Sequence, residues 1–276
     1  MVFPGFVTAL QPPLRACSRM RTAGLIFFMF VVFAETTAAQ EPLRTESGRL
    51  ADWMYKDAGA WVRSVNAGQL GFVAGSTAFL AIVSTGDESF SQAATHWGGG
   101  NVGKALDFAN ELGGPYGLLI PVSIFGVSMV THNTRFQDAA FTSLQSYVYS
   151  NTIVMVTKIA VGRSRPTAGV GSHDFHPFTG GRSFPSGHTS SVFAMVMPWV
   201  FYYPGPVTYS LVGIAALTAM ARLQRQKHWF TDVFAGAAIS TSMSYYLYSR
   251  HEDLQFPAPE ASLGPGMLSL RFSVAL

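Results

Sequence analysis

The chain has 276 residues, which is enough for one large domain or two small ones. Apolar residues make up 49% and charged residues 12%, about half the usual charged share, so the composition indicates a membrane protein or an unusually apolar helical protein. The net charge of +3 is too small to indicate a nucleic-acid-binding protein. The single cysteine, Cys17, excludes a disulfide framework and a cysteine-ligated metal cluster.

Residues 1–39 have the pattern of a signal peptide or an N-terminal anchor. Three arginines precede the uncharged run GLIFFMFVVFA, and small residues follow it up to Ala39. A basic segment, an apolar segment and small residues before a cleavage point are typical of a secretory signal. We therefore expect cleavage of this segment, with an uncleaved anchor helix as the alternative. Residues 40–63 follow as an amphipathic lead-in that we expect to form a surface helix.

Five later windows contain no Asp, Glu, Lys or Arg, and Pro204 and Pro206 divide the fourth of them. The windows are 64–86, 112–134, 139–157, 189–221 and 233–249. The resulting six apolar segments have roughly 15 to 23 residues, at or slightly below the length of a bilayer span. Their apolar character runs around the whole segment. We therefore predict an all-α fold, a six-helix bundle over 64–249 that is embedded in or associated with a membrane.

Two flanking segments lack this apolar pattern. Residues 87–111 are rich in glycine and are predicted to form a connection. Within them GGGNVG, from Gly98 to Gly103, fits a dinucleotide-binding pattern, but no predicted strand precedes it, so we interpret it as a loop. The tail, 250–276, is predicted to be disordered, with a pairing strand in MLSLRFSVAL as the alternative.

The direction of the chain brings the ionisable residues at the window edges to one end of the bundle. The third predicted helix ends, and the fourth begins, on the same side. The tight turn YYPGP sends the fifth helix back to that side, where the sixth helix begins. The residues that share this end are Lys158, Arg163, Arg165, His188, Arg222, His228 and Asp232.

Several of these residues suit an anion-binding site. Lys158 and Arg165 are seven residues apart, so on one helix they share an azimuth and lie roughly 10 Å apart along the axis. Arg222 adds a third cation, and the mutual repulsion of three cations favours an anion between them. The backbone N–H groups of Ser186 and Gly187, at a helix N-terminus, are further candidate donors to that anion.

Two histidines and an aspartate at the same end suit nucleophilic chemistry. His228 and Asp232 are four residues apart on one helix face, so the carboxylate can bind one ring nitrogen and leave the other free to attack. His188 can donate a proton from the opposite side. A single histidine beside an apolar helix is usually a packing residue; the shared location of all these groups favours an active site. The nearby SHDFHPF segment is interpreted as an ordinary exposed loop.

Three motifs in order carry a resemblance to a known family. KIAVGRSRP matches K-x6-R-P, PSGH at 185–188 matches a second motif, and ARLQRQKHWFTD matches S-R-x5-H-x3-D with Ala221 in place of serine. The sequence thus resembles the type-2 phosphatidic acid phosphatase and vanadium haloperoxidase superfamily. The motifs cover about 139–249, and the six predicted helices extend the resemblance to about 64–249.

The resemblance implies a covalent phosphohistidine mechanism that needs no metal or other cofactor. In that mechanism His228 attacks phosphorus, Asp232 orients it, and His188 protonates the leaving oxygen. The groups implied to hold the phosphoryl oxygens are Lys158, Arg165, Arg222 and the backbone of Ser186 and Gly187. The alanine at 221 removes a hydroxyl near the phosphate, which we expect to weaken positioning without abolishing function.

The implied activity is that of a phosphomonoesterase or pyrophosphatase acting on a lipid phosphate, such as phosphatidic acid, an isoprenyl pyrophosphate or a lipid A-type phosphate. The alternatives are a periplasmic non-specific acid phosphatase, a vanadate-dependent haloperoxidase and a non-catalytic module that binds lipid or phosphate. The expected partners are the phosphate ester and the membrane, with no nucleic acid, and the oligomeric state is left open.

The signal-like segment and the helix count disagree about which side the site faces. Arginines before the first apolar run place the N-terminus in the cytoplasm, and six full spans after one crossing would place the site there too. The signal pattern and the habit of the resembled family favour the opposite side. We therefore expect a bacterial-type cell envelope protein, in the inner membrane or on the periplasmic face of a membrane, with a periplasmic active site.

Overall fold

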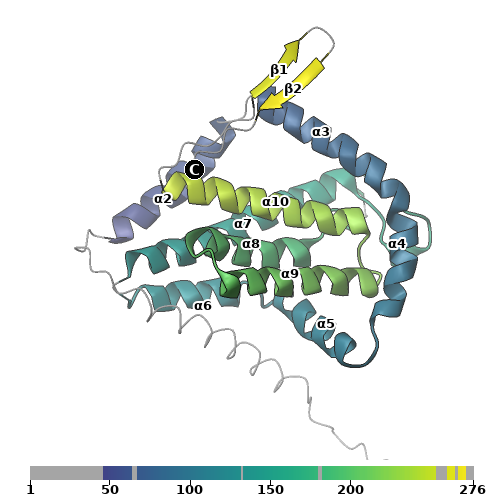
Figure 1. The fold of residues 1–276 in the computed structure, drawn as a ribbon, viewed down its shortest axis with the longest axis horizontal. Helices are drawn as coiled ribbons and strands as arrows, with labels where there is room; N and C mark the ends of the chain where they lie inside the picture. Colours follow the sequence, from purple (N-terminus) through teal and green to yellow (C-terminus); the bar gives the residue numbers. More distant parts are fainter. Residues whose placement is uncertain are drawn as a thin grey trace, which may run out of the picture.

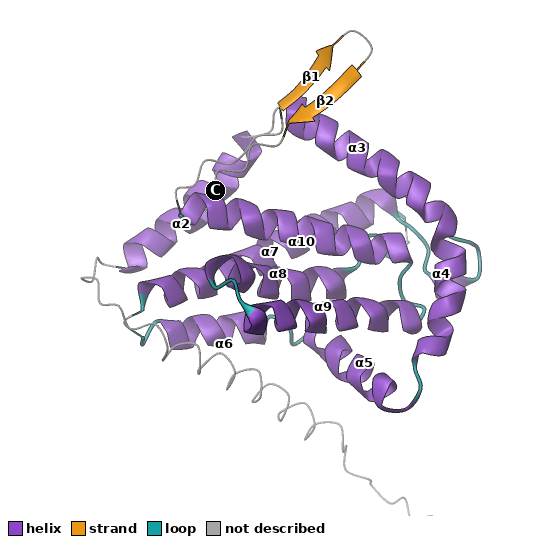
Figure 2. Cartoon of the chain, in the orientation of Figure 1, coloured by secondary structure: helices purple, strands orange, loops and turns teal. Residues whose placement is uncertain are grey.

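The computed structural model of the protein describes residues 46–63, 67–131, 133–179, 182–252, 260–264 and 267–271. The predicted signal segment, 1–39, lies outside these residues. Within them the chain is almost entirely helical (Figures 1 and 2). The elements are α2 (Glu46–Arg63), α3 (Ala67–Val83), α4 (Asp87–Ala94), α5 (Gly100–Leu112), α6 (Leu119–Ser128), α7 (Thr134–Val161), α8 (Gly187–Tyr202), α9 (Pro206–Gln224), α10 (Phe230–His251), β1 (Glu260–Gly264) and β2 (Met267–Arg271).

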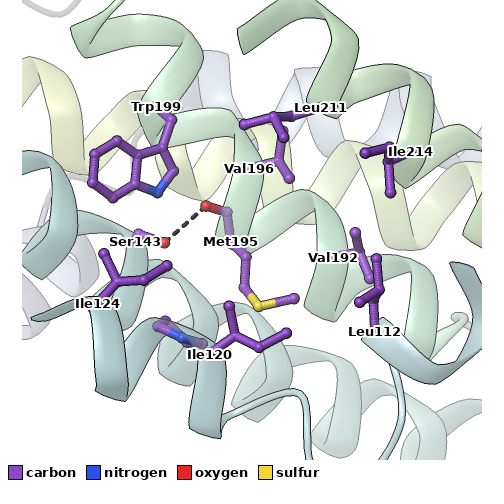
Figure 3. A pocket seen from close by; sticks show the side chains of 11 residues that line it. Leu112, Ile120, Ile124, Ser143, Val192, Met195, Val196, Trp199, Leu211 and Ile214 are labelled. Atoms are coloured by element: carbon purple, nitrogen blue, oxygen red, sulfur yellow. Dashed lines mark hydrogen bonds between the residues drawn. The ribbon is translucent and has the colours of Figure 1, made fainter. Parts of the chain in front are cut away.

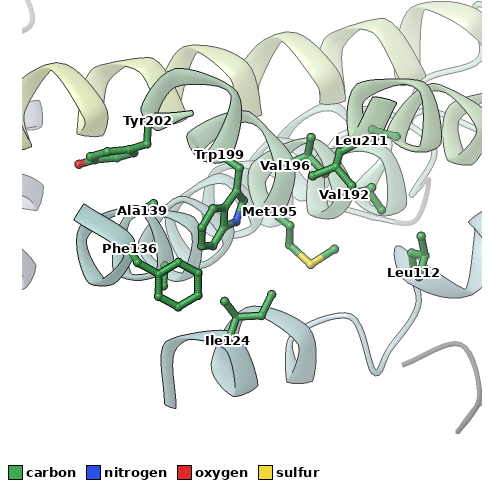
Figure 4. Close-up of a cluster of buried hydrophobic side chains, with 12 residues drawn as sticks. Leu112, Ile124, Phe136, Ala139, Val192, Met195, Val196, Trp199, Tyr202 and Leu211 are labelled. Carbon is green, nitrogen blue, oxygen red and sulfur yellow. The ribbon is translucent and has the colours of Figure 1, made fainter. Parts of the chain in front are cut away.

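Helix α8 is the centre of the bundle. It packs against α7, α9 and α10, while α5 packs on α9 and α6 on α7 (Figure 1). The main core lies between these helices, where Phe136 and Trp199 are each 1% exposed with ring centroids 5.4 Å apart (Figure 4). Burying one such aromatic side chain contributes about 2–3 kcal/mol to stability. The predicted all-helical bundle is therefore confirmed.

The ends of α7 follow from local sequence. At its start, the side chain of Asn133 accepts a hydrogen bond from the backbone N–H of Phe136, 3.0 Å away, as N-cap residues do. At its end, Gly162 adopts a left-handed conformation with φ 61°, and a Cβ there would lie 1.9 Å from the carbonyl oxygen of His176. Only glycine fits this turn, which sends the chain back across the end of the bundle.

Each of the six predicted apolar segments corresponds to one α-helix, but the region before the second window was misread. Residues 87–111 are not a loop-like connection, because they contain α4 and α5. The Gly98–Gly103 stretch is likewise only partly a loop, since α5 begins at Gly100. Glycines and scattered charges hid the period of these helices. Among described side chains, the main core cluster includes Leu112 of α5 and none from α3, which lies at the edge of the molecule (Figure 1).

The predicted lead-in, 40–63, contains α2, which contacts α7 and the C-terminal end of α10. The buried carboxylate of Asp57 lies 2.9 Å from Nε2 of His251 and accepts a 3.1 Å hydrogen bond from Gln145. The Trp53 ring stacks on the imidazole of His251 with centroids 3.7 Å apart. These contacts hold a helix with a polar surface against α7 and α10.

The tail differs from the prediction of disorder over 250–276. Strands β1 and β2 pair as an antiparallel hairpin, with Glu260 opposite Arg271 and Gly264 opposite Met267. This is close to the pairing strand that the sequence left open as an alternative. Helix α10 also continues to His251, past the end of the last apolar window.

One helix in the described part of the chain has the length and apolar composition of a membrane span. Helix α9 has 19 residues and is apolar enough to cross a bilayer by length and composition. The helix also packs against α5 and α8, and 39% of its apolar window is buried within the protein.

Candidate active site

The ends of four helices meet on the side of the bundle beside α4 (Figure 1). They are the C-terminal ends of α7 and α9 and the N-terminal ends of α8 and α10. Hydrogen bonds join three of these ends, those of α7, α8 and α10: Ser186 donates its backbone N–H to the carbonyl oxygen of Asp232 at 2.8 Å, and Arg163, just after α7, reaches the Asp232 carboxylate at 2.7 Å. The predicted convergence of chain ends therefore occurs in the structure.

His228 and Asp232 face each other at the start of α10. Nδ1 of His228 lies 3.6 Å from Oδ2 of Asp232, a little beyond hydrogen-bond length, and the two side chains are 3% and 0% exposed. Burial lowers the pKa of His228 to about 4, although the nearby Asp232 carboxylate works in the opposite direction. The imidazole is therefore neutral near pH 7 and can act as a nucleophile through Nε2.

The Asp232 carboxylate is held from several sides. Oδ2 accepts a 2.9 Å hydrogen bond from the backbone N–H of Trp229 and another from the hydroxyl of Ser183, while Oδ1 accepts from Nη1 of Arg163 at 2.7 Å. Burial raises the pKa of Asp232, but the adjacent His228 imidazole and the charge of Arg163 more than offset this and lower it. The group is thus an ionised, fixed acceptor.

Arg163 and Ser183 were not given a site role by the sequence, and neither was Asp87. Nη2 of Arg163 binds Oδ2 of Asp87 at 2.7 Å, at the first residue of α4. A signal for Arg163 existed, because it sits inside the KIAVGRSRP motif. None existed for Asp87, which lies in the segment read as a connection, or for Ser183, which precedes PSGH.

Lys158 holds the segment before α8. Its ammonium donates to the carbonyl oxygens of Arg182 at 2.9 Å, Ser183 at 3.2 Å and Pro185. These three bonds occupy all three of its N–H donors. Direct contact with a phosphoryl oxygen stays a prediction, and it requires one of these bonds to exchange.

The prediction that Lys158 and Arg165 share one helix face is wrong, because Arg165 does not lie on the helix that carries Lys158. Helix α7 ends at Val161, and the left-handed Gly162 places Arg165 in the following loop. The buried Nε of Arg165 has no hydrogen-bond partner among the described residues. An unpartnered buried guanidinium nitrogen fits an anion site.

Arg222, near the end of α9, is the second cation with a free nitrogen. The side chain is buried and Nη1 donates to the amide oxygen of Asn110 in α5 at 2.8 Å, while Nε has no partner in the described part of the chain. Its neighbour Ala221 is fully buried, so the position that carries serine in the motif presents no hydroxyl here. Helix α5, missed by the sequence analysis, thus orients one predicted phosphate ligand.

The start of α8 supplies fewer free donors than predicted. Ser186 is the N-cap, but its backbone N–H is already bonded to the carbonyl oxygen of Asp232, so the expected phosphate contact there would require that bond to break. Gly187 begins the helix and stays a predicted donor. Gly236 of α10 packs closely here, since a Cβ on it would lie 2.5 Å from the carbonyl oxygen of Ser186.

His188 shares one electrostatic environment with the cations. Burial, together with the charges of Arg222, His228, Arg165 and Lys158 acting in the same direction, lowers its pKa to about 3. The four groups that act on this imidazole therefore lie near it, at the same end of the bundle. A bound dianion among them would raise the pKa of His188 again, which is what a proton donor at this position requires.

The SHDFHPF loop and an apolar pocket in the bundle add no ionisable group to the candidate site. The loop carrying His173 and His176 is exposed, as predicted, although Ser172 within it is 2% exposed. The pocket in Figure 3 lies between α5, α6, α7, α8 and α9 and is lined by apolar side chains together with Ser143. The Ser143 hydroxyl donates to the carbonyl oxygen of Met195 at 2.8 Å, so the pocket offers no acid, base or nucleophile.

Comparison with known proteins identifies the region that carries these motifs. A family model of the PAP2 superfamily matches residues 139–256. The lipid A 1-phosphatase of Rhizobium johnstonii is 31% identical over 102 residues, which are 35% of this chain and 41% of that protein. The lipid A 1-phosphatase of Porphyromonas gingivalis is 32% identical over 90 residues, which are 32% of this chain and 18% of that protein. The chain therefore spans less than half the length of these two relatives.

One solved structure covers most of the chain. A transmembrane PAP2-type phosphatidylglycerolphosphate phosphatase from Bacillus subtilis aligns with 86% of this chain and 98% of its own, with a TM-score of 0.50 and 19% sequence identity. At that identity the likeness concerns the fold. It extends well beyond residues 139–256 and so includes helices that the motifs do not reach.

Proposed function

We propose that this chain, whose residues 139–256 belong to the PAP2 superfamily, is a metal-independent phosphatase that releases phosphate from a lipid through a phosphohistidine at His228. The observation that carries the proposal is the meeting of His228, His188 and the unpartnered guanidinium nitrogens of Arg165 and Arg222 at one end of the bundle. The cations neutralise a phosphoryl dianion, which allows a neutral nucleophile to approach phosphorus.

In the first step, Nε2 of His228 attacks phosphorus while Nδ1 faces the Asp232 carboxylate. The new N–P bond forms as the P–O bond to the lipid breaks, and the leaving oxygen takes a proton from His188. The imidazole gains positive charge as it is phosphorylated, and the ionised Asp232 stabilises that charge. In the second step, water gives a proton to His188 and attacks phosphorus, and the N–P bond electrons return to Nε2.

A lipid substrate is supported by the outer surface and by the relatives. Large apolar side chains are exposed on the outside of α7, including Met155 at 63% and Val156 at 60%, within two turns of the site end. Val73 and Ile82 of α3 are similarly exposed. Such surfaces suit contact with lipid. The names of the curated relatives, lipid A 1-phosphatases, point to the same class of substrate.

Substrate class is tested by comparing phosphate release from lipid phosphates in mixed micelles with release from a soluble phosphomonoester. We expect kcat/KM to be at least about 100-fold higher for the lipid, because burying four methylene groups at about 0.8 kcal/mol each is worth roughly that factor. Equal values for lipid and soluble esters would favour the alternative, a non-specific acid phosphatase. Absence of hydrolysis for both would refute the phosphatase proposal.

We place the site on the periplasmic face, and Val170 offers the probe for this. It is 58% exposed in the loop between α7 and α8, whereas nearby Ser172 is buried. In a Cys17→Ser background, Val170→Cys should react with a membrane-impermeant thiol reagent in spheroplasts. Val207→Cys, at the opposite end of the bundle, should react only after membrane rupture if the bundle spans the bilayer. Labelling of Val170→Cys only after rupture would place the site in the cytoplasm.

A further inference from the structure

Asp87 is a buried carboxylate outside the region matched to the superfamily. It is the first residue of α4 and is 0% exposed. Its Oδ1 accepts a 3.0 Å hydrogen bond from the backbone N–H of Thr231, and its Oδ2 accepts from the hydroxyl of the same residue. Thr231 immediately precedes Asp232, so α4 is bonded directly to the turn that carries the Asp232 carboxylate.

Arg163 connects the two carboxylates. Nη2 binds Oδ2 of Asp87 and Nη1 binds Oδ1 of Asp232, both at 2.7 Å, while Nε donates to the carbonyl oxygen of Ser172 at 2.8 Å. The guanidinium also lies 5.5 Å from the ring centroid of Trp229. Its side chain is 2% exposed, so this planar fork is fixed in one orientation.

The combined charge of Asp87, Arg163 and Asp232 affects the nucleophile. Arg163 and Asp232 alone form a neutral pair, and Asp87 leaves the three groups with one net negative charge. The imidazole of His228 lies beside Asp232 and also feels the positive charges of Lys158 and Arg222. Because the imidazole becomes cationic when phosphorylated, a net negative support behind Asp232 favours that step.

We propose that Asp87 is a positioning residue for the reaction: through Arg163 and Thr231 it fixes the Asp232 carboxylate and supplies the negative charge that stabilises phosphorylated His228. The proposal rests on the proposed phosphatase function. It assigns a role in the reaction to α4, which lies outside the three motifs but binds Arg163 and Thr231 within them.

The test compares Asp87→Asn with Glu88→Gln in the full-length enzyme, using a lipid phosphate substrate. Glu88 is the matched control, because it is the next carboxylate on α4. It accepts a 3.0 Å hydrogen bond from the backbone N–H of Ser172, the residue whose carbonyl oxygen binds Arg163. We expect Asp87→Asn to lower kcat about 10-fold with KM unchanged. We expect Glu88→Gln to stay within about 2-fold of the wild type.

The acid limb of kcat/KM separates this role from a merely structural one. That limb reports the pKa of His228, which must be neutral to attack. The charged or titratable groups facing it are Asp232, Lys158, Arg222 and His188. Loss of negative charge at 87 should move the limb to lower pH. If the substitution only loosened the packing around His228, water would reach the imidazole and its pKa would rise towards the ordinary histidine value of about 6.5. The limb would then move to higher pH, which would overturn the proposal.

Two further variants keep the test decisive. Asp87→Glu retains the charge and should keep the limb at its wild-type position. If Asp87→Asn does not fold, Arg163→Lys serves instead, because lysine keeps the charge but cannot bind two carboxylates in a planar fork; wild-type kcat in that variant would overturn the proposal. An inactive wild type would refute the phosphatase function itself, whereas an active wild type with a normal Asp87→Asn variant would refute only the role of Asp87.

Discussion

His228→Ala is expected to lower kcat by at least about 10⁴-fold, because it removes the atom that forms the bond to phosphorus. The alanine leaves Lys158, Arg165 and Arg222 in place, so the variant should still bind inorganic phosphate. The protein should remain folded, because the neutral imidazole of His228 makes no hydrogen bond through Nδ1 in the described structure.

The matched control is His176→Ala. His176 lies in the exposed loop between α7 and α8, and its imidazole lies 2.9 Å from the carboxylate of Asp174. We expect its kcat to stay within about 2-fold of the wild type. Initial rates of phosphate release, together with circular dichroism to verify folding, are sufficient for both variants. Turnover in His228→Ala within 10-fold of the wild type would contradict the assignment of the nucleophile.

Asp232→Asn is expected to lower kcat by about 10³-fold and leave a small measurable rate. Asparagine matches the shape of aspartate, but its amide nitrogen is a donor. The neighbours of the carboxylate, Arg163, Ser183 and the backbone N–H of Trp229, are all donors, so one of these bonds must be lost. The charge that stabilises phosphorylated His228 is lost as well.

The same substitution should cost about 3 kcal/mol of stability, since it leaves a buried donor unpaired and weakens a buried ion pair. The pKa of Asp232 is lowered in the folded protein, so this contribution is present above the unfolded value of 3.8 and is lost as pH falls through the folded value. Thermal unfolding at pH 7 therefore should show the difference, and it should shrink in acid. An Asp232→Asn enzyme within 10-fold of wild-type activity would contradict the orienting role.

The arrangement of the bundle end could be predicted because it depends on simple rules. Apolar windows set the number and direction of the helices, and the Pro204–Pro206 turn forces α9 back to the side where α8 begins. These features need only helix periodicity and short connections. The four-residue spacing does bring His228 beside Asp232, but His228 lies before α10 begins at Phe230, so the predicted shared helix face is wrong.

The supporting contacts could not be predicted in the same way. Asp87 and Asn110 come from α4 and α5, whose glycines and mixed polarity conceal a helical pattern, and their contacts with Arg163 and Arg222 span more than 70 residues of sequence. The turn at Gly162 depends on a carbonyl oxygen of the following loop. Long-range hydrogen bonds of this kind follow from the packed structure and leave no periodic trace in the sequence.

The most direct measurement is covalent trapping. Enzyme mixed with a lipid labelled in its phosphate with ³²P and quenched with alkali within milliseconds should carry label on the protein. A phosphohistidine is stable in alkali and lost in mild acid, and digestion should place the label on the peptide that contains His228. His228→Ala should carry none. A wild-type enzyme that turns over without any trapped label, or carries it on another residue, would contradict the phosphohistidine mechanism.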